Sequence, residues 1–175
     1  MRFARSTPSN RSTAFTLIEA LIATFILTLA TVGIAQLLGS SAQQAGAMQD
    51  KSISLELAKQ LMEEIAAKPV ADSAGNISLG HESGENSRGQ YDTIDDYHLY
   101  RDTTDSLTMI DGTPIDLGDG QVYSRSVAVE YRLVPAGPAT TSSAAPFCVV
   151  TVTVSSPNAP PATLTRLFAR AKGGG

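Results

Sequence analysis

The sequence predicts an α+β protein in which one long N-terminal helix packs on a small antiparallel β-sheet. Residues 20–38 contain no charged side chain and are mostly apolar, which favours a membrane-spanning start of the helix. Residues 53–65 repeat an apolar side chain every four positions, which is helical spacing. Residues 122–171 are rich in valine, threonine and tyrosine between proline-containing turns, which indicates strands.

The length of 175 residues suits one folded domain of ordinary size with an additional anchor. We expect a basic leader, a transmembrane helix, an amphipathic continuation of that helix, a polar variable loop region and a C-terminal antiparallel sheet. These five segments span residues 1–14, 15–38, 39–68, 69–121 and 122–175, respectively.

The first half of the helix has the length that a bilayer requires. A bilayer core of roughly 30 Å needs about 20 apolar residues in helical form. Arg2, Arg5 and Arg11 precede this run, and no acidic residue lies among them. By the positive-inside rule the N-terminus stays in the cytoplasm, so the C-terminal body faces the periplasm or the cell surface.

Glu19 is a charged residue at the start of this apolar segment, which is unusual. A carboxylate in lipid costs of order 2 to 3 kcal/mol near the centre of a helix and less near its end. The next basic residue along the chain is Lys51, which lies beyond the apolar run. A partner for Glu19 must therefore come from another chain or from a change at the N-terminus.

Residues 14–20 read Ala-Phe-Thr-Leu-Ile-Glu-Ala, with a short basic leader before them and a hydrophobic helix after them. This arrangement resembles the prepilin-type cleavage and methylation signal of type IV pilins and type II secretion pseudopilins. The resemblance implies that prepilin peptidase cuts between Ala14 and Phe15 and that the new Phe15 amine is methylated. It further implies that Glu19 pairs with the Phe15 amine of a neighbouring subunit during assembly. The family usually has glycine before the cut, so Ala14 predicts slower processing.

The resemblance implies a pilin-like fold and a structural role as a minor pilin or pseudopilin. The implied partners are the prepilin peptidase, other pilins or pseudopilins and an inner-membrane assembly platform. The chain would reside in the bacterial inner membrane and then in a pilus or pseudopilus. Residues 57–65 and 91–98 further resemble the MSHA-type minor pilins, and one cysteine excludes the intrachain disulfide of many major pilins. The sequence leaves open adhesion, twitching, DNA uptake and secretion, and also tip or shaft position.

Two other interpretations of the N-terminus remain open. The chain can be an uncut anchor that holds a periplasmic binding domain and does not polymerise. It can also carry an ordinary signal peptide that is cut after Ala47, where the sequence Ala-Gly-Ala has small residues at the required spacing. The apolar run is longer than such a signal needs, and Glu19 would be unusual within it.

The second half of the helix is amphipathic. Ile53, Leu57, Leu61 and Ile65 share one face, and we expect the part of the helix between residues 55 and 65 to cover the sheet. Polar side chains occupy the other face, namely Glu56, Lys59, Gln60, Glu63 and Glu64. We expect an ion pair between Glu64 and Lys68, a stop at Pro69 and a continuous helix over residues 16–67.

The polar region 69–121 is too long to be a simple connection, so we expect short elements within it. Its carboxylates suggest a calcium site, because calcium prefers several oxygen ligands and some pseudopilins have a calcium loop. The spacing does not match an EF-hand, and acidic residues in loops commonly cap turns. The candidate ligands are Asp92, Asp95, Asp96, Asp102 and Asp105.

Three strands are predicted at the C-terminal end, over residues 122–134, 147–155 and 162–171. In the first, Tyr123, Val127, Val129, Tyr131 and Leu133 alternate with polar residues. In the second, one face consists of Cys148, Val150, Val152 and Val154. Turns at residues 135–146 and 157–161 join the strands into an antiparallel meander.

The sequence gives no positive support for catalysis, a cofactor or nucleic-acid binding. Cys148 shares the buried phase of its strand, while His81 and His98 lie 17 residues apart outside any zinc-site pattern. No Gly-x-Ser-x-Gly elbow or phosphate loop is present. Without the leader, ten basic residues stand against 17 acidic ones, a formal charge of −7 that disfavours nucleic acid.

Overall fold

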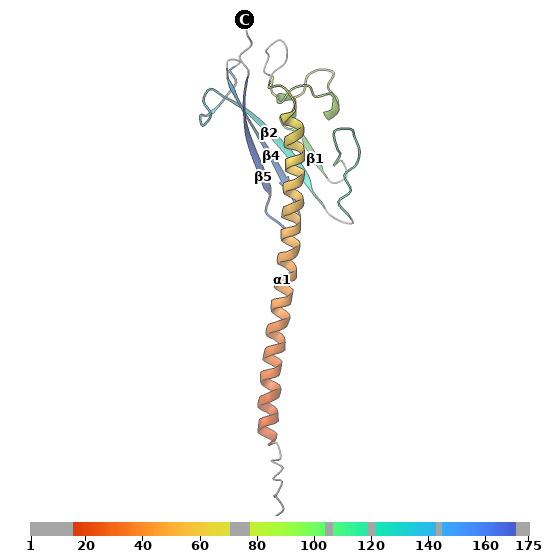
Figure 1. The fold of residues 1–175 in the computed structure, drawn as a ribbon, viewed down its shortest axis with the longest axis vertical. Coiled ribbons are helices and arrows are strands. Elements are labelled where there is room, and N and C mark those ends of the chain that lie inside the picture. Colours follow the sequence, from red (N-terminus) through yellow and green to blue (C-terminus); the bar gives the residue numbers. More distant parts are fainter. Residues whose placement is uncertain (1–15, 71–77, 104–106, 119–121, 143–144, 171–175) are drawn as a thin grey trace, which may run out of the picture. The chain divides into compact units, whose positions relative to one another are not determined.

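The computed structural model describes residues 16–70, 78–103, 107–118, 122–142 and 145–170. The chain divides into two compact units, Met1–Gln44 and Ala45–Gly175. One helix, α1 (Leu17–Ala66), contributes its N-terminal part to the first unit and its C-terminal part to the second (Figure 1). The helix begins one residue later and ends one residue earlier than the sequence predicted.

The second unit contains the predicted antiparallel meander. Its strands are β2 (Ser124–Arg132), β4 (Phe147–Ser155) and β5 (Ala162–Ala169). β4 lies between β2 and β5 and pairs with both in antiparallel register. The three strands therefore confirm the α+β arrangement that the alternating pattern predicted.

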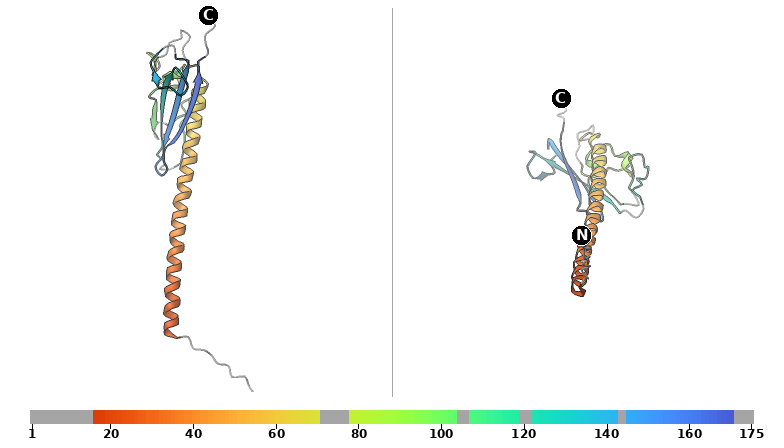
Figure 2. Two further views of the ribbon diagram at one scale, coloured as in Figure 1. Left: turned by 90° about the vertical axis from the view of Figure 1, so that its left-hand side faces the viewer. Right: turned by 60° about the horizontal axis from the view of Figure 1, so that its bottom comes forward.

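Two further strands extend this sheet beyond the prediction. β1 (Arg101–Thr103) pairs with the first residues of β2, and β3 (Ala139–Thr140) pairs with its last residues. The four longest strands lie in the order β1, β2, β4 and β5, with α1 along one side of the sheet (Figures 1 and 2). Strands of two or three residues are too short to show a period of two, so the sequence did not reveal them.

The core of the second unit forms between α1 and the inner face of the sheet. The predicted inward residues of β4 are all fully buried, which confirms the phase of that strand. From α1 the core receives Leu57, Ala58, Leu61, Met62 and Ile65.

One position differs from the predicted packing, whereas Leu57, Leu61 and Ile65 of the predicted helix face are buried as expected. Leu133 is 54% exposed, because β2 ends at Arg132 and no longer constrains it. The remaining predicted inward residues of the strand are buried, as expected.

The polar region between helix and sheet contains short elements, as the sequence predicted. They are the 3-10 helices η1 (Arg88–Gln90) and η2 (Asp95–Tyr97) together with β1. Their core is aromatic, since the ring of Tyr97 meets that of Tyr91 edge to face at 5.0 Å. The backbone N–H of Ile94 donates to the Pro69 carbonyl, which attaches the region to the end of the helix.

Cys148 should be inert towards thiol reagents in the folded protein. Its side chain is fully buried, and burial, with a smaller contribution from Asp95, raises its pKa to about 12. The pKa of an unfolded cysteine is about 8.5. The neutral buried thiol therefore makes its full contribution to stability below that pH, and this contribution is lost as the pH rises towards 12. We expect maleimide at pH 8 to label Cys148 only after unfolding in urea, as measured by mass spectrometry. Rapid labelling of the folded chain would contradict this.

Candidate functional site

The predicted assembly residue Glu19 lies in the first turn of α1. The Thr16 hydroxyl is 3.4 Å from the Glu19 backbone nitrogen and 3.4 Å from Glu19 Oε2. This is the side-chain arrangement of a helix cap, and the Thr-x-x-Glu spacing is its sequence signature. Ala14 and Phe15, the predicted cleavage and methylation positions, lie outside the described residues.

The N-terminal part of α1, up to residue 44, exposes all of its apolar side chains. All residues from 17 to 44 are exposed, including Leu17 at 83% and Leu37 at 70%. One 18-residue window of α1 has a mean hydropathy of 2.2 and no buried residue. By length and composition this helix can cross a membrane, as a signal sequence near the N-terminus also can.

Four hydroxyl groups on this apolar segment donate to backbone carbonyls of the same helix. Thr24 Oγ1 donates to the Leu21 carbonyl at 2.9 Å, and Thr28 Oγ1 donates to the Thr24 carbonyl at 2.8 Å. Thr31 and Ser40 donate to carbonyls three residues before them. These side chains therefore require no water and are compatible with an apolar surrounding.

The second unit holds a buried ion pair that the sequence did not reveal. Arg125 lies on the inward face of β2 and is 1% exposed. Its Nε is 3.0 and 3.1 Å from the two carboxylate oxygens of Asp102, and its Nη2 donates to the Thr108 carbonyl at 2.9 Å. The pair therefore joins β2, β1 and the segment after β1 across the interior.

Arg88 extends this pair to the helix. Its Nε is 3.0 Å from Glu64 Oε1, and its Nη1 is 3.7 Å from Asp102 Oδ2. The Tyr97 hydroxyl also donates to Glu64 Oε1 at 2.8 Å. Glu64, predicted to face solvent and to pair with Lys68, instead belongs to this network. Its side chain is only 10% exposed, and the Lys68 ammonium donates to the Tyr91 carbonyl at 2.5 Å.

Asp50 forms a separate polar contact between α1 and the sheet. Its carboxylate accepts hydrogen bonds from the Tyr123 hydroxyl and the Asn158 amide, both at 3.0 Å. Tyr123 lies just before β2, and Asn158 lies in the turn between β4 and β5. Asp50 is 4% exposed, so both oxygens are satisfied away from bulk solvent.

The acidic residues proposed as calcium ligands mostly serve the fold. The Asp102 carboxylate forms an ion pair with Arg125. Asp95 accepts hydrogen bonds from Thr93 Oγ1 at 2.6 Å and from the Ser78 nitrogen at 2.9 Å. Burial raises the pKa of Asp95. Asp105 lies outside the described residues. Within the described part of the chain, one set of carboxylate oxygens lies within 4.8 Å of one another, on Glu85, Asp92 and Asp96.

Asp96 Oδ2 in that set already accepts from the backbone nitrogens of Asp92 and Thr93 and from the Thr93 hydroxyl. These three donors give Asp96 the role of a turn cap, which is common for an aspartate in a loop. Calcium binding stays a prediction, with Glu85 added to its candidate ligands.

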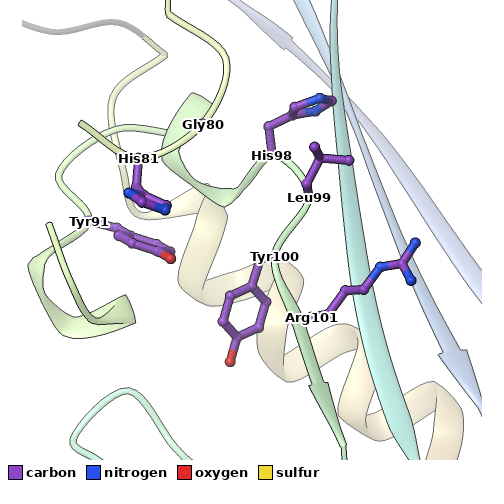
Figure 3. A pocket seen from close by; sticks show the side chains of 7 residues that line it. All are labelled: Gly80, His81, Tyr91, His98, Leu99, Tyr100 and Arg101. Atoms are coloured by element: carbon purple, nitrogen blue, oxygen red, sulfur yellow. The ribbon is translucent and has the colours of Figure 1, made fainter. Parts of the chain in front are cut away.

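A cavity of about 430 Å³ lies beside β1 and η2 (Figure 3). The His81 and Tyr91 rings stack there, with an interplanar angle of 4° and a centroid distance of 6.2 Å. On the other side, His98 Nδ1 accepts a hydrogen bond from the Val129 nitrogen at 3.2 Å. Leu99 has a φ of 64°, which is strained for a leucine. The two histidines thus have structural contacts.

Sequence reasoning missed the charged residues of the interior. The alternation that places Tyr123 and Val127 inward also places Arg125 inward, so this signal was available. No comparable pattern marks Asp102 or Arg88 within the polar region. Comparison with known proteins finds no matching family model, no matching curated protein and no matching solved structure.

Proposed function

We propose that this chain is a minor pilin or pseudopilin, a structural subunit that enters a type IV pilus or a type II secretion pseudopilus. The observation that carries the proposal is the carboxylate of Glu19 in the first turn of α1, whose residues 17–44 are all exposed and mostly apolar. Such a surface needs a lipid or protein partner, because a soluble monomer rarely exposes a contiguous apolar patch of this kind.

Glu19 favours assembly over simple anchoring. A plain anchor gains nothing from a carboxylate at the edge of the bilayer, whereas a subunit can use it to bind a cation on its neighbour. The only hydrogen-bond partner of the carboxylate in the described residues is the Thr16 hydroxyl, which leaves its charge unbalanced. After cleavage at Ala14, the Phe15 amine of an adjacent subunit supplies the positive charge.

The remaining parts of the chain suit a structural role. In this proposal the helices bundle in the filament, and the sheet with its polar loops faces outward from the periplasmic side. The prepilin peptidase, other pilins or pseudopilins and the inner-membrane assembly platform are its partners. No catalytic group is assigned, and both histidines beside the cavity have structural contacts.

N-terminal sequencing of the protein purified from membranes tests the proposal. We expect the mature chain to begin at Phe15 with a methylated amine, because the peptidase removes residues 1–14. A start at Met1 would indicate an uncut anchor, and a start at Met48 would indicate an ordinary signal peptide; either result would overturn the proposal. Ala14→Gly is the matched variant, and we expect it to lower the ratio of precursor to mature protein.

The second candidate is a membrane-anchored domain that binds a ligand or partner without polymerising. The cavity at Tyr91 and the strained Leu99 favour it, because backbone strain concentrates at functional sites. Crosslinking of intact cells separates the two functions. A filament subunit gives ladders with itself or with other pilins, whereas a monomeric anchored domain gives none.

A further inference from the structure

His98 joins the segment before β1 to the outer edge of β2 through its side chain. The Val129 N–H donates to His98 Nδ1 at 3.2 Å. Just before β1, the Tyr100 N–H donates to the Tyr97 carbonyl, and the backbone turns away from β2 into η2. The imidazole therefore takes the place that a backbone carbonyl would have in a regular antiparallel ladder.

A strained β-bulge lies next to His98 in the chain. The Leu99 N–H donates to the Val127 carbonyl, and the Val127 N–H donates to the Tyr100 carbonyl, so two residues lie opposite one. Leu99 has a φ of 64°, a left-handed conformation that is unfavourable for a leucine. Such a conformation persists only while the surrounding contacts hold it. Loss of a neighbouring contact therefore favours its release.

Open space lies on two sides of the imidazole. His98 lines the cavity of about 430 Å³, which Figure 3 shows between the stacked rings of His81 and Tyr91 and the segment that carries His98. It also lines a second cavity of about 530 Å³, next to Leu79 and Ala139. The His98 side chain is itself only partly buried. The ring can therefore leave the edge of β2 without entering the core.

The hydrogen bond from Val129 depends on the protonation state of His98. A ring nitrogen of histidine accepts a hydrogen bond only when it carries no proton, and both ring nitrogens carry one in the imidazolium form. The Val129 N–H would then face a second N–H instead of a lone pair. An ordinary histidine titrates at about pH 6.5, so the contact is expected above that range and is lost as the pH falls through it.

The other titratable and charged groups around His98 do not replace this acceptor. They are Glu130 and Tyr131 from β2, Asp95 from η2, and His81, Tyr91 and Arg101 around the first cavity. The Glu130 carboxylate pairs with Arg132 at 2.7 Å, and the Asp95 carboxylate accepts from Thr93 and Ser78. Arg101 and a protonated His81 would add to a positive charge on His98 rather than offset it.

We propose that His98 is a pH-sensitive contact that releases the segment before β1 from the edge of β2 in acid. Protonation breaks the hydrogen bond from Val129, the imidazolium moves away from the edge, and the strained bulge at Leu99 relaxes. The Val129 N–H then becomes open to solvent between β1 and β3, which cover the rest of this edge. This local change needs neither membrane anchoring nor polymerisation, so it goes beyond the proposed function and does not depend on it.

His98→Asn is the decisive variant. Asparagine carries its Oδ1 acceptor at the position of histidine Nδ1, and its side chain does not titrate. His81→Asn is the matched control, because His81 lines the same cavity but contacts Tyr91 by stacking rather than binding the Val129 N–H. The first variant thus removes the pH dependence of the contact, and the second leaves it in place.

Residue-resolved hydrogen exchange of the full chain in mild detergent tests the proposal at pH 7.5 and pH 5. After correction for the intrinsic exchange rate, we expect the Val129 amide to lose at least about tenfold in protection at pH 5 in the wild type and in His81→Asn. In His98→Asn its protection should be the same at both pH values. The amides of β4 report global unfolding, and they should stay protected in all three proteins, since β4 pairs on both sides.

Equal protection of the Val129 amide at both pH values in the wild type would overturn the proposal. An equal acid loss in His98→Asn would also overturn it, because another group would then be responsible. Loss of protection throughout β4 would replace a local release by unfolding of the whole unit. The ring nitrogen shifts of His98 in the wild type give a check that needs no variant, since protonation of Nδ1 and loss of Val129 protection must share one midpoint; two different midpoints would contradict the proposal.

Discussion

Arg125→Met is expected to lower the free energy of unfolding of the sheet-containing unit by about 3 kcal/mol, a typical cost of removing one partner from a buried ion pair. The variant leaves the Asp102 carboxylate buried at 4% exposure without its guanidinium. The Tyr100 hydroxyl still donates to Asp102 at 3.0 Å, and the Arg88 guanidinium remains at 3.7 Å. These remaining contacts keep the effect at the lower end of the usual range.

Urea unfolding of the full chain in mild detergent measures this effect, with alkylation of Cys148 as the signal. Arg101→Met is the matched control, because Arg101 is an exposed arginine on the neighbouring strand. We expect that variant to change stability by less than about 0.5 kcal/mol. The double variant Arg125→Met with Asp102→Leu should recover much of the loss, because it removes the uncompensated charge. A loss below about 1 kcal/mol in the single variant would mean that the pair is not the central contact of this region.

The elements that the sequence predicted are those with a long, regular pattern. α1, β2 and β4 follow from apolar spacing over many residues, and their bounds agree with the structure to within a few residues. The two short strands were not predicted. β1 and β3 have too few residues for a period, and their existence depends on β2 offering an edge.

The polar interior was less predictable for a different reason. Asp102 and Arg125 are 23 residues apart, and only the register of β1 on β2 brings them together. Glu64 was mispredicted for the same reason, because Lys68, four residues later, suggested a local ion pair. Once Tyr97 and Arg88 fold over the helix, Glu64 accepts a hydrogen bond from Tyr97 and forms an ion pair with Arg88, and burial makes these the stronger partners. The spacing of residues along the sequence does not predict which of these partners Glu64 contacts.

Glu19→Gln is expected to abolish crosslinked ladders while the protein remains in the membrane at normal abundance. Glu19 also contacts Thr16 within its own helix. The effect of Glu19→Gln on assembly must therefore be distinguished from the effect of losing a helix cap. A capping box works with glutamine as well as with glutamate. Glu19→Gln therefore keeps the cap but removes the charge that would bind the Phe15 amine of a neighbour.

Thr16→Ala provides the opposite change, since it removes the cap and keeps the carboxylate. That substitution costs about 1 kcal/mol of helix stability and should leave the ladders intact. Glu56→Gln is a further control, because Glu56 is an exposed glutamate of the same helix in the second unit. If Glu19→Gln assembles normally and Thr16→Ala does not, Glu19 only starts the helix, and the anchored monomer becomes the better account. If the reverse holds, the charge of Glu19 acts between subunits, because within its own helix the charge adds only an interaction with the helix dipole of about 0.3 to 1 kcal/mol.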